Sequence, residues 1–230
     1  MKLKQLKALL YKETANLRYN GQFFVMIILL LFFYAILSLE PYPSWMFLVV
    51  LTLIMLPLQM QGLLLAEEKE QQTWRILKEQ GVYLYGIALV KAMPLFVITC
   101  VFVFFISIFS GLGFVTSLFV CIFITPALLV MLSIGTIVAS YATDKIEVGI
   151  WEGPIIIIFI ALEIMREFLP RDASFTPLGL LPNYQFYEGL TLITHQPTEA
   201  FLSHFIYFLL WAAGFVFLAA YVLHKRKHTF

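Results

Sequence analysis

The sequence has 230 residues, of which 61% are hydrophobic and only 13% are charged. A soluble domain of this size carries about 25% charged and about 45–50% apolar residues, so one soluble core cannot hold this excess, and lipid is the expected solvent for much of the chain. The formal net charge of +1 gives no overall basic field, which argues against a nucleic-acid partner.

The first 20 residues carry leucines near helical spacing, set between Lys2, Lys4, Lys7, Lys12 and Arg18. This pattern predicts that residues 1–20 form an amphipathic helix on the inner membrane surface. The apolar run Phe23–Leu37 is long for the hydrophobic part of a signal peptide and ends without a small-x-small cleavage site. We therefore expect it to be an uncleaved first span.

A helix needs about 20 apolar residues to cross about 30 Å of hydrocarbon. Six runs meet this requirement, and they are roughly Gln22–Leu39, Ser44–Ala66, Gly86–Ser110, Phe114–Tyr141, Ile150–Leu169 and Phe201–His224. No repeat or second soluble domain is visible. The sequence therefore predicts an all-α integral membrane protein, a single domain over residues 1–230 with six transmembrane helices.

Lysine and arginine predict the orientation of these spans, because cytoplasmic loops carry an excess of both. With a cytoplasmic N-terminus, Arg166 and Arg171 are the only two of the 15 basic residues that fall on the outer side. The basic clusters near the two termini then lie on the same side, which requires an even number of spans. We expect a multi-pass protein of the cell membrane with both termini in the cytoplasm.

Residues 67–85 form the longest inner loop, rich in helix-forming residues up to the stop signal Gly81. Trp74 and Leu77, with Ile76 beside them, give this segment a small apolar stripe. On a charged cytoplasmic helix such a stripe needs a partner surface. The alternative is that the segment packs back on the bilayer, with Trp74 as an interfacial anchor.

Residues 170–198 form the only long outer segment, and prolines and glycines interrupt it. Between these breaks, Tyr184–Ile193 is predicted to form a short helix. This stretch is too apolar and aromatic to extend freely into water, so we expect a re-entrant helix between spans five and six that dips into the outer leaflet.

The sequence lacks the patterns that carry catalysis. It has no His-Glu-x-x-His, no Gly-x-Ser-x-Gly and no P-loop, so any ATP would be bound by another polypeptide. The four histidines have no metal-ligand spacing, and Cys100 and Cys121 fit the pattern of small buried apolar residues. We therefore expect neither enzyme activity nor a cofactor in this chain.

Charged residues inside a span are costly in lipid and mark candidate functional sites. The outer half of the fifth span carries three of them at helical spacing: Glu163, Arg166 and Glu167. They could line an exit path, or they could form an ion-paired helix end that reaches outer water. Glu152 begins the same span near the inner face, where we expect it at the interface.

The inner loop resembles that of the permease subunits of type-2 ABC transporters, which carry an acidic-basic-acidic stretch between their second and third spans. The matching residues are Glu68, Lys69, Glu70, Thr73, Trp74 and Leu77. Gln72 stands where the family usually has Gly, and Lys78 where a second Leu is common. Leu181–Tyr187 is similar to the family's proline-and-aromatic stretch after the fifth span, so the resemblance runs over almost the full length.

The resemblance implies that residues 67–81 are a coupling helix that docks on a separate cytoplasmic ATPase. The residues implied to make this contact are Glu68, Glu70, Thr73, Trp74, Leu77 and Lys78. The working unit would contain two P-loop ATPase subunits, which bind the ATP and Mg, and a second permease, identical or related. It would move a hydrophobic or amphipathic substrate (a peptide, lipid or drug) out of the cytoplasm or inner leaflet.

Three other functions would require different features of the sequence. An integral membrane enzyme acting on lipids would need acid, metal or nucleophile groups that the sequence does not show. An ion-coupled secondary transporter would predict inverted repeats and discontinuous helices with buried charge at mid-membrane. A small polytopic assembly or immunity factor would need no coupling helix.

Overall fold

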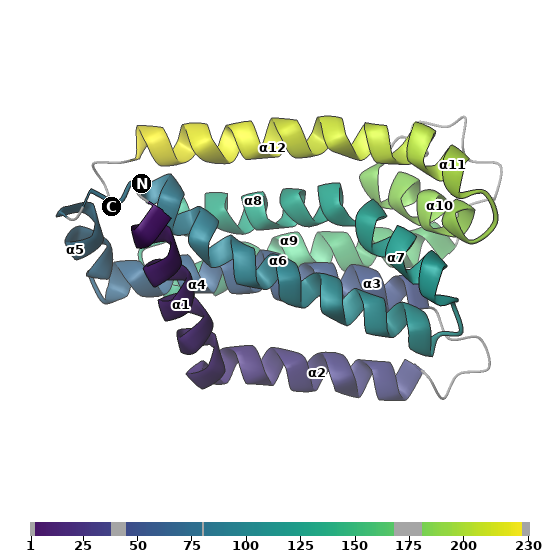
Figure 1. Cartoon of the computed structure of the whole chain (residues 1–230), viewed down its shortest axis with the longest axis horizontal. Coiled ribbons are helices and arrows are strands. Elements are labelled where there is room, and N and C mark those ends of the chain that lie inside the picture. Colours follow the sequence, from purple (N-terminus) through teal and green to yellow (C-terminus); the bar gives the residue numbers. More distant parts are fainter. Residues whose placement is uncertain (1–2, 38–44, 80, 168–180, 227–230) are drawn as a thin grey trace.

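The computed structural model describes residues 3–37, 45–79, 81–167 and 181–226, and every regular element in these ranges is a helix. The helices are α1 (Leu3–Tyr19), α2 (Gly21–Leu37), α3 (Trp45–Leu53), η1 (Ile54–Gln59), α4 (Met60–Glu70), α5 (Thr73–Glu79), α6 (Leu84–Phe109), α7 (Phe114–Phe123), α8 (Thr125–Tyr141), α9 (Lys145–Glu167), α10 (Pro182–His195), α11 (Pro197–Ala200), η4 (Phe201–Phe205) and α12 (Ile206–Lys225). Figure 1 shows them as one elongated bundle, with α1 and α5 at one end and α10 and α11 at the other. The predicted all-α class is confirmed for this part of the chain.

Four helical segments are long and apolar enough to cross a membrane: Trp45–Glu70, Leu84–Phe109, Lys145–Met165 and Pro197–Lys225. Two further pairs qualify only with a bend, α1 with α2 at 63° and α7 with α8 at 41°. The described residues therefore hold four to six candidate spans, and the predicted number is reached if each bent pair counts once.

The sharp bend after α1 separates a polar helix from an apolar one. In Figure 1, α1 turns away from the axis of the bundle while α2 runs along it. Asn20 stabilises the start of α2, because its side-chain oxygen accepts a hydrogen bond from the backbone N–H of Phe23 at 3.1 Å. This geometry agrees with an N-terminal helix across the end of the bundle, and its place on a membrane surface remains a prediction.

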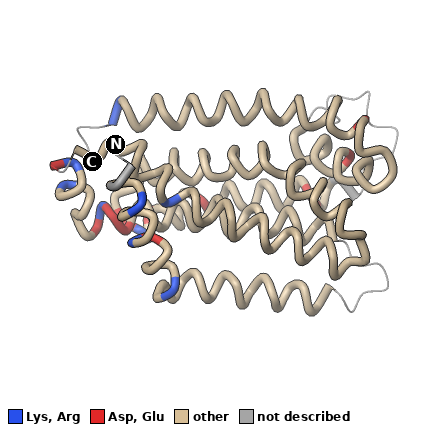
Figure 2. The backbone as a smooth tube through the Cα atoms, viewed as in Figure 1, with Lys and Arg blue, Asp and Glu red and all other residues tan. Residues whose placement is uncertain are grey.

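Charged residues are segregated along the bundle. Figure 2 shows lysine and arginine gathered at the end that holds α1, α5 and the last turn of α12. The same end carries most of the acidic residues in the picture, so it is a charged end rather than a basic one. The long apolar middle and one charged end are what a protein embedded in lipid requires.

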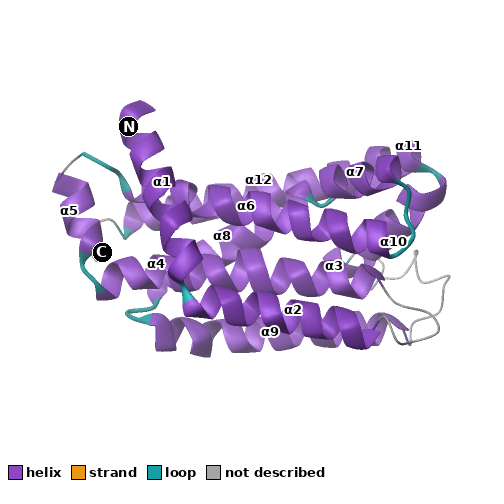
Figure 3. Ribbon diagram, turned by 60° about the horizontal axis from the view of Figure 1, so that its bottom comes forward, coloured by secondary structure: helices purple, strands orange, loops and turns teal. Residues whose placement is uncertain are grey.

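The span formed by α3, η1 and α4 is the centre of the molecule. In its most apolar stretch 89% of the residues are buried, against 17% to 33% for the other three unbent candidate spans. Its half at the charged end, α4, contacts α6, α8 and α9. Figure 3 shows these helices side by side around it. The other candidate spans leave wide apolar faces exposed.

Two glycines let helices approach this central span closely. A Cβ atom placed on Gly135 of α8 would lie 2.3 Å from the backbone oxygen of Leu58. One placed on Gly62 of α4 would lie 2.1 Å from Oε1 of Glu152 on α9. Small residues at such crossings allow tight van der Waals contact between helices. In lipid this contact stabilises helix packing, because the hydrophobic effect does not drive helices together there.

Several predicted boundaries shift because helices break or extend. Pro57 has no N–H for the α-helical ladder, and the chain accommodates it as the π-helix η1 in the middle of the second span. The fourth run is two helices, since α8 starts anew at Thr125 with Pro126 in its first turn. The sixth span begins at Pro197 rather than at Phe201.

The short helix predicted in the outer segment is present as α10, which packs against α7, α9 and η4. Phe123 of α7 stacks with Phe186 of α10 at 5.9 Å between ring centroids. His204 and Gln185 are hydrogen-bonded at 2.8 Å, which fixes α10 to the start of the sixth span. Residues 168–180 of the predicted segment lie outside the described ranges, and insertion of α10 into lipid stays a prediction.

Candidate functional site

A buried ion-pair cluster joins α4 to α1 and α6 at the charged end. The Glu68 carboxylate lies 3.0 Å from the ammonium groups of both Lys12 and Lys91. Lys91 also binds Glu13 of α1 at 2.8 Å, and it is only 2% exposed. Thr73 donates a further hydrogen bond to Glu68. These contacts define the ionic cluster of Lys12, Glu13, Glu68 and Lys91.

The ionic cluster shifts the pKa of its most exposed member. Burial by itself would lower the pKa of Lys12, but the hydrogen bond and charge of Glu68 and the charge of Glu13 outweigh it. The pKa of Lys12 is therefore raised above its ordinary value, and this lysine stays protonated throughout the physiological range. Sequence reasoning missed the cluster, and the available signal was Lys91 itself, since a lysine near the start of an apolar run needs a partner.

The two residues after Glu68 tie α4 to two further helices. The Lys69 ammonium group donates to the backbone oxygens of Ala139 at 2.7 Å and Ala142 at 2.6 Å, at the C-terminal end of α8. A cation there satisfies carbonyls that have no helical partner. Glu70 accepts the backbone N–H of Lys145, the first residue of α9, at 2.7 Å. Glu68, Lys69 and Glu70 together therefore connect α4 to α1, α6, α8 and α9.

The predicted coupling segment is shorter than expected. Helix α4 continues to Glu70, so the separate helix is α5, bounded by the left-handed residues Gln72 (φ 54°) and Gly81 (φ 78°). Gly81 closes α5 through its N–H, which donates to the backbone oxygen of Lys78 at 2.9 Å. The predicted helix over 67–81 is thus corrected to 73–79, projecting from the charged end in Figure 1.

The predicted coupling residues differ in how far their side chains are exposed. Glu70 and Lys78 are exposed, while Thr73, Trp74 and Leu77 are half-buried and Glu68 is buried. Trp74 and Leu77 pack against the hydrophobic core, and the Arg75 and Lys78 cations lie 5.6 and 5.5 Å from the Trp74 ring. The apolar residue that α5 presents outward is Ile76, at 56% exposure. The exposed face of α5 is thus Arg75, Ile76, Lys78 and Glu79.

The predicted polar residues of the fifth span lie at the end of α9 away from α5. Glu163 is 3% exposed, so its side chain lies inside the protein. Arg166 and Glu167 end the same helix, and their side chains lie outside the described part of the structure. The choice between an exit path and an ion-paired helix end therefore stays open.

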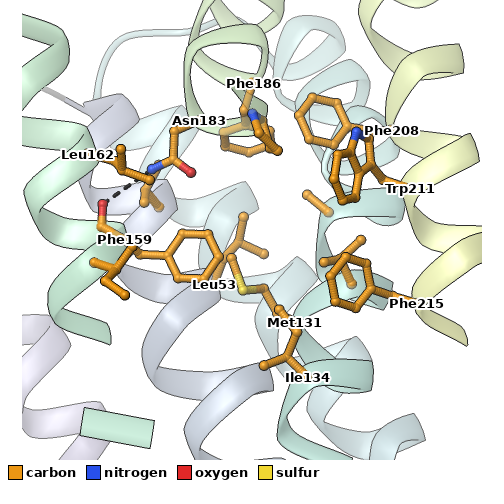
Figure 4. Close-up of a pocket in the computed structure, with 15 residues that line it drawn as sticks. Leu53, Met131, Ile134, Phe159, Leu162, Asn183, Phe186, Phe208, Trp211 and Phe215 are labelled. Atoms are coloured by element: carbon orange, nitrogen blue, oxygen red, sulfur yellow. Dashed lines mark hydrogen bonds between the residues drawn. The ribbon is translucent and has the colours of Figure 1, made fainter. Parts of the chain in front are cut away.

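An apolar cavity of about 210 Å³ lies in the half of the bundle away from the charged end. Figure 4 shows side chains from five helices pointing into it, among them Leu53 (α3), Met131 (α8), Phe159 (α9), Phe186 (α10) and Trp211 (α12). Asn183 supplies the only amide side chain of the lining. Its amide donates to the backbone oxygen of Phe159 at 3.2 Å, which joins α10 to α9.

The cavity is suited to an apolar ligand. A dry, hydrocarbon-lined space of about 150 Å³ is enough to bind benzene, so this one can hold a ring or a segment of an alkyl chain. A larger amphipathic molecule would place only its apolar part here.

Comparison with models of known families, with curated proteins and with solved structures finds no significant match. Within the described ranges, no three His, Cys, Asp or Glu side chains come together in a group that could hold a metal ion.

Proposed function

We propose that this chain is the membrane-spanning permease subunit of an ATP-driven exporter of the type-2 ABC kind. It moves a hydrophobic or amphipathic substrate out of the cytoplasm or the inner leaflet. A separate cytoplasmic ATPase supplies the energy, with two ATPase subunits and a second permease, identical or related, in the working unit. The charged end, which holds the first and last described residues Leu3 and Arg226, faces the cytoplasm of the cell.

One observation carries the proposal: the exposed helix α5 is joined by a two-residue turn to the helical span whose far part lines the apolar cavity. Two residues, Gln71 and Gln72, separate α5 from α4, which continues without a gap through η1 into α3. Val50 and Leu53 of α3 line the cavity. A displacement of α5 would therefore pass through this turn to the span that lines the cavity.

The contacts around α4 explain how a push at one helix would move several. Glu68, Lys69 and Glu70 bind groups on α1, α6, α8 and α9. The π-helix η1 lies between this connected inner half and the cavity, and irregular turns of this type are common where helices bend in function. Closure of an ATPase dimer against α5 would tilt α4 and its partners and reshape the cavity.

The test is affinity purification of the chain from its native membranes, with mass spectrometry and an ATPase assay of the eluate. We expect a P-loop ATPase to accompany the wild-type chain. The double variant Ile76→Asp, Lys78→Glu should lose it, because the change reverses charge and polarity on the exposed face of α5 without touching the core.

Ile146→Asp is the matched control, because Ile146 is an exposed isoleucine at the same end, 76% exposed on α9. It should retain the ATPase. A wild-type chain that elutes alone and without ATP hydrolysis would contradict the proposal.

An ion-coupled secondary transporter is the second candidate, and one observation favours it. Such a transporter would show inverted repeats and discontinuous helices with buried charge at mid-membrane, and the buried carboxyl group of Glu152 is the feature that favours it. Uptake of a fluorescent amphiphile into proteoliposomes separates the two. Dependence on ATP and the ATPase supports the exporter, while dependence on a proton gradient alone supports the alternative.

A further inference from the structure

Glu152 of α9 is a buried carboxyl group that none of the contacts described above engages. We expected it at the membrane interface, but its exposure is 0%. Neither of its carboxyl oxygens has a hydrogen-bond partner among the described residues. It faces Gly62 of α4, whose missing side chain leaves the room that the carboxyl group occupies.

The charged groups nearest in the fold bind other partners. Helix α9 packs against α4, α8, α10 and η1. On α4, Glu67 pairs with Lys145 of α9 at 3.3 Å, Lys69 donates to carbonyls of α8, and Glu68 and Glu70 are held as described above.

Among the side chains that the structure describes, the remaining elements bring no counter-ion to Glu152. On α8 the titratable group is Tyr141, which is covered by Arg226 at 3.8 Å. The π-helix η1 has none. Helix α10 lies at the opposite end of the bundle, with its titratable Tyr184, Tyr187, Glu188 and His195. On α9 itself, Glu147 binds Thr143 and Trp151, and Glu163 is three turns away.

An ionised carboxylate in this position would lose its hydration and gain no compensating charge. Within a bilayer the neutral acid is then strongly favoured over the anion. Glu152 therefore carries a proton while α9 is packed against α4. Exposure to water would remove that preference, because a hydrated glutamic acid is ionised at neutral pH.

We propose that Glu152 is a proton-binding site whose occupancy depends on the packing of α9 against α4. When the two helices separate at the charged end, water reaches the carboxyl group and its O–H bond breaks. The proton passes to that water and a carboxylate remains. Repacking takes one proton back from the same side, so each opening and closing exchanges one proton.

The site connects this exchange to α5, because α4 leads directly into that helix. Low pH favours the packed arrangement and high pH the separated one, since only the separated arrangement ionises. The ratio of separated to packed molecules should rise by up to about tenfold for each pH unit above the ordinary range of glutamic acid. The inference concerns helices of this chain alone, so it stands whichever energy source drives transport.

The first experiment measures the proton directly by infrared spectroscopy of the full chain in phosphatidylcholine vesicles at neutral pH. The difference spectrum between wild type and Glu152→Gln should contain the carbonyl band of a neutral carboxylic acid. Glu147→Gln, five residues away on the same helix, should give a carboxylate difference instead. A carboxylate difference for Glu152→Gln would overturn the proposal.

The second experiment measures the coupling. Spin labels on Ile76→Cys of α5 and Ile146→Cys of α9, with Cys100 and Cys121 replaced by alanine, report the separation of α4 from α9 in the same vesicles. Between about pH 5 and about pH 9, a longer-distance population should grow in the otherwise wild-type chain and in Glu147→Gln. It should not change in Glu152→Gln. A distribution that is independent of pH in the wild-type background, or equally dependent in Glu152→Gln, would overturn the proposal.

Discussion

Lys91 is the most deeply buried cation among the described residues, and its two carboxylate partners come from different helices. A buried ion pair does not stabilise a protein merely by being formed, because the free-energy cost of removing the charges from water offsets much of their attraction. The larger effect appears when one member is removed and the others remain. Lys91 therefore determines whether Glu13 and Glu68 can stay buried together.

We expect Lys91→Met to destabilise the protein by about 3–5 kcal/mol, because two buried carboxylates would then share only the half-exposed Lys12. Thermal unfolding of the detergent-solubilised chain measures the loss. Adding Glu13→Gln should recover part of it by removing the uncompensated charge.

The matched control is Lys145→Met, which breaks the more exposed pair with Glu67. It should cost no more than about 1 kcal/mol. Equal losses for Lys91→Met and Lys145→Met would show that the ionic cluster does not hold the helices together.

Glu152 shows why the position of a charge along the chain did not reveal its environment. The sequence places it two residues into the predicted fifth run, which suggests the interface. In the structure α9 begins earlier, at Lys145, and Glu152 is turned toward Gly62 of α4. Its burial depends on the face that a distant helix presents, and helical spacing within α9 contains no information about that helix.

The central span is the element on which the others assemble. Its neighbours reach it through glycines at two crossings, and the obstacles that a side chain would meet there differ. At Gly135 the obstacle is the backbone oxygen of Leu58, which cannot move without bending η1. At Gly62 it is the far end of the Glu152 side chain, which can rotate away.

We therefore expect Gly135→Ala to destabilise the protein more than Gly62→Ala, with losses of about 1–3 kcal/mol for the milder change. Gly153→Ala is the control, because Gly153 lies beside Glu152 and has no atom within 4 Å of an added Cβ. That change should be neutral or stabilising by about 0.5–1 kcal/mol, as alanine favours helix. Melting temperatures of the three variants in one detergent test the order, and a reversed order would contradict the packing described for Gly135.

The existence of most helices was predictable from the sequence, whereas the residues at which they begin and end were less predictable. Apolar runs of sufficient length predict helices, because unsatisfied backbone groups are too costly in lipid for other structures. Breaks within runs depend on competition between local strain and packing. Pro57 produced a π-helix rather than an end, since α4 is held in line by its contacts with α6, α8 and α9.

The whole molecule separates its two working regions along the bundle. The charged end holds α5 and the ionic cluster, and the other half holds the apolar cavity. If the cavity is where the apolar part of a substrate binds, filling it should abolish that binding while leaving the charged end intact.

Val130→Trp tests this, because Val130 of α8 lines the cavity and a larger side chain would occupy it. A photoactivatable alkyl lipid should crosslink to Met131 and Trp211 in the wild type and several-fold less in the variant. Phe217→Trp is the control, since Phe217 is 74% exposed on α12 and outside the cavity. Unchanged crosslinking in Val130→Trp would exclude the cavity as a binding site.

The sequence by itself determined the helical fold, the apolar segments that are candidate membrane spans, the short helix α10 and the separation of charged from apolar segments. These follow from local composition, because the length and polarity of a run decide whether lipid can be its solvent. Only the tertiary structure decided that Lys91 meets Glu13, 78 positions away, that Trp74 turns inward while Ile76 turns outward, and that Glu152 lies against Gly62. Burial and pairing depend on side chains that other helices bring to the same place, and the order of residues along one helix does not specify them.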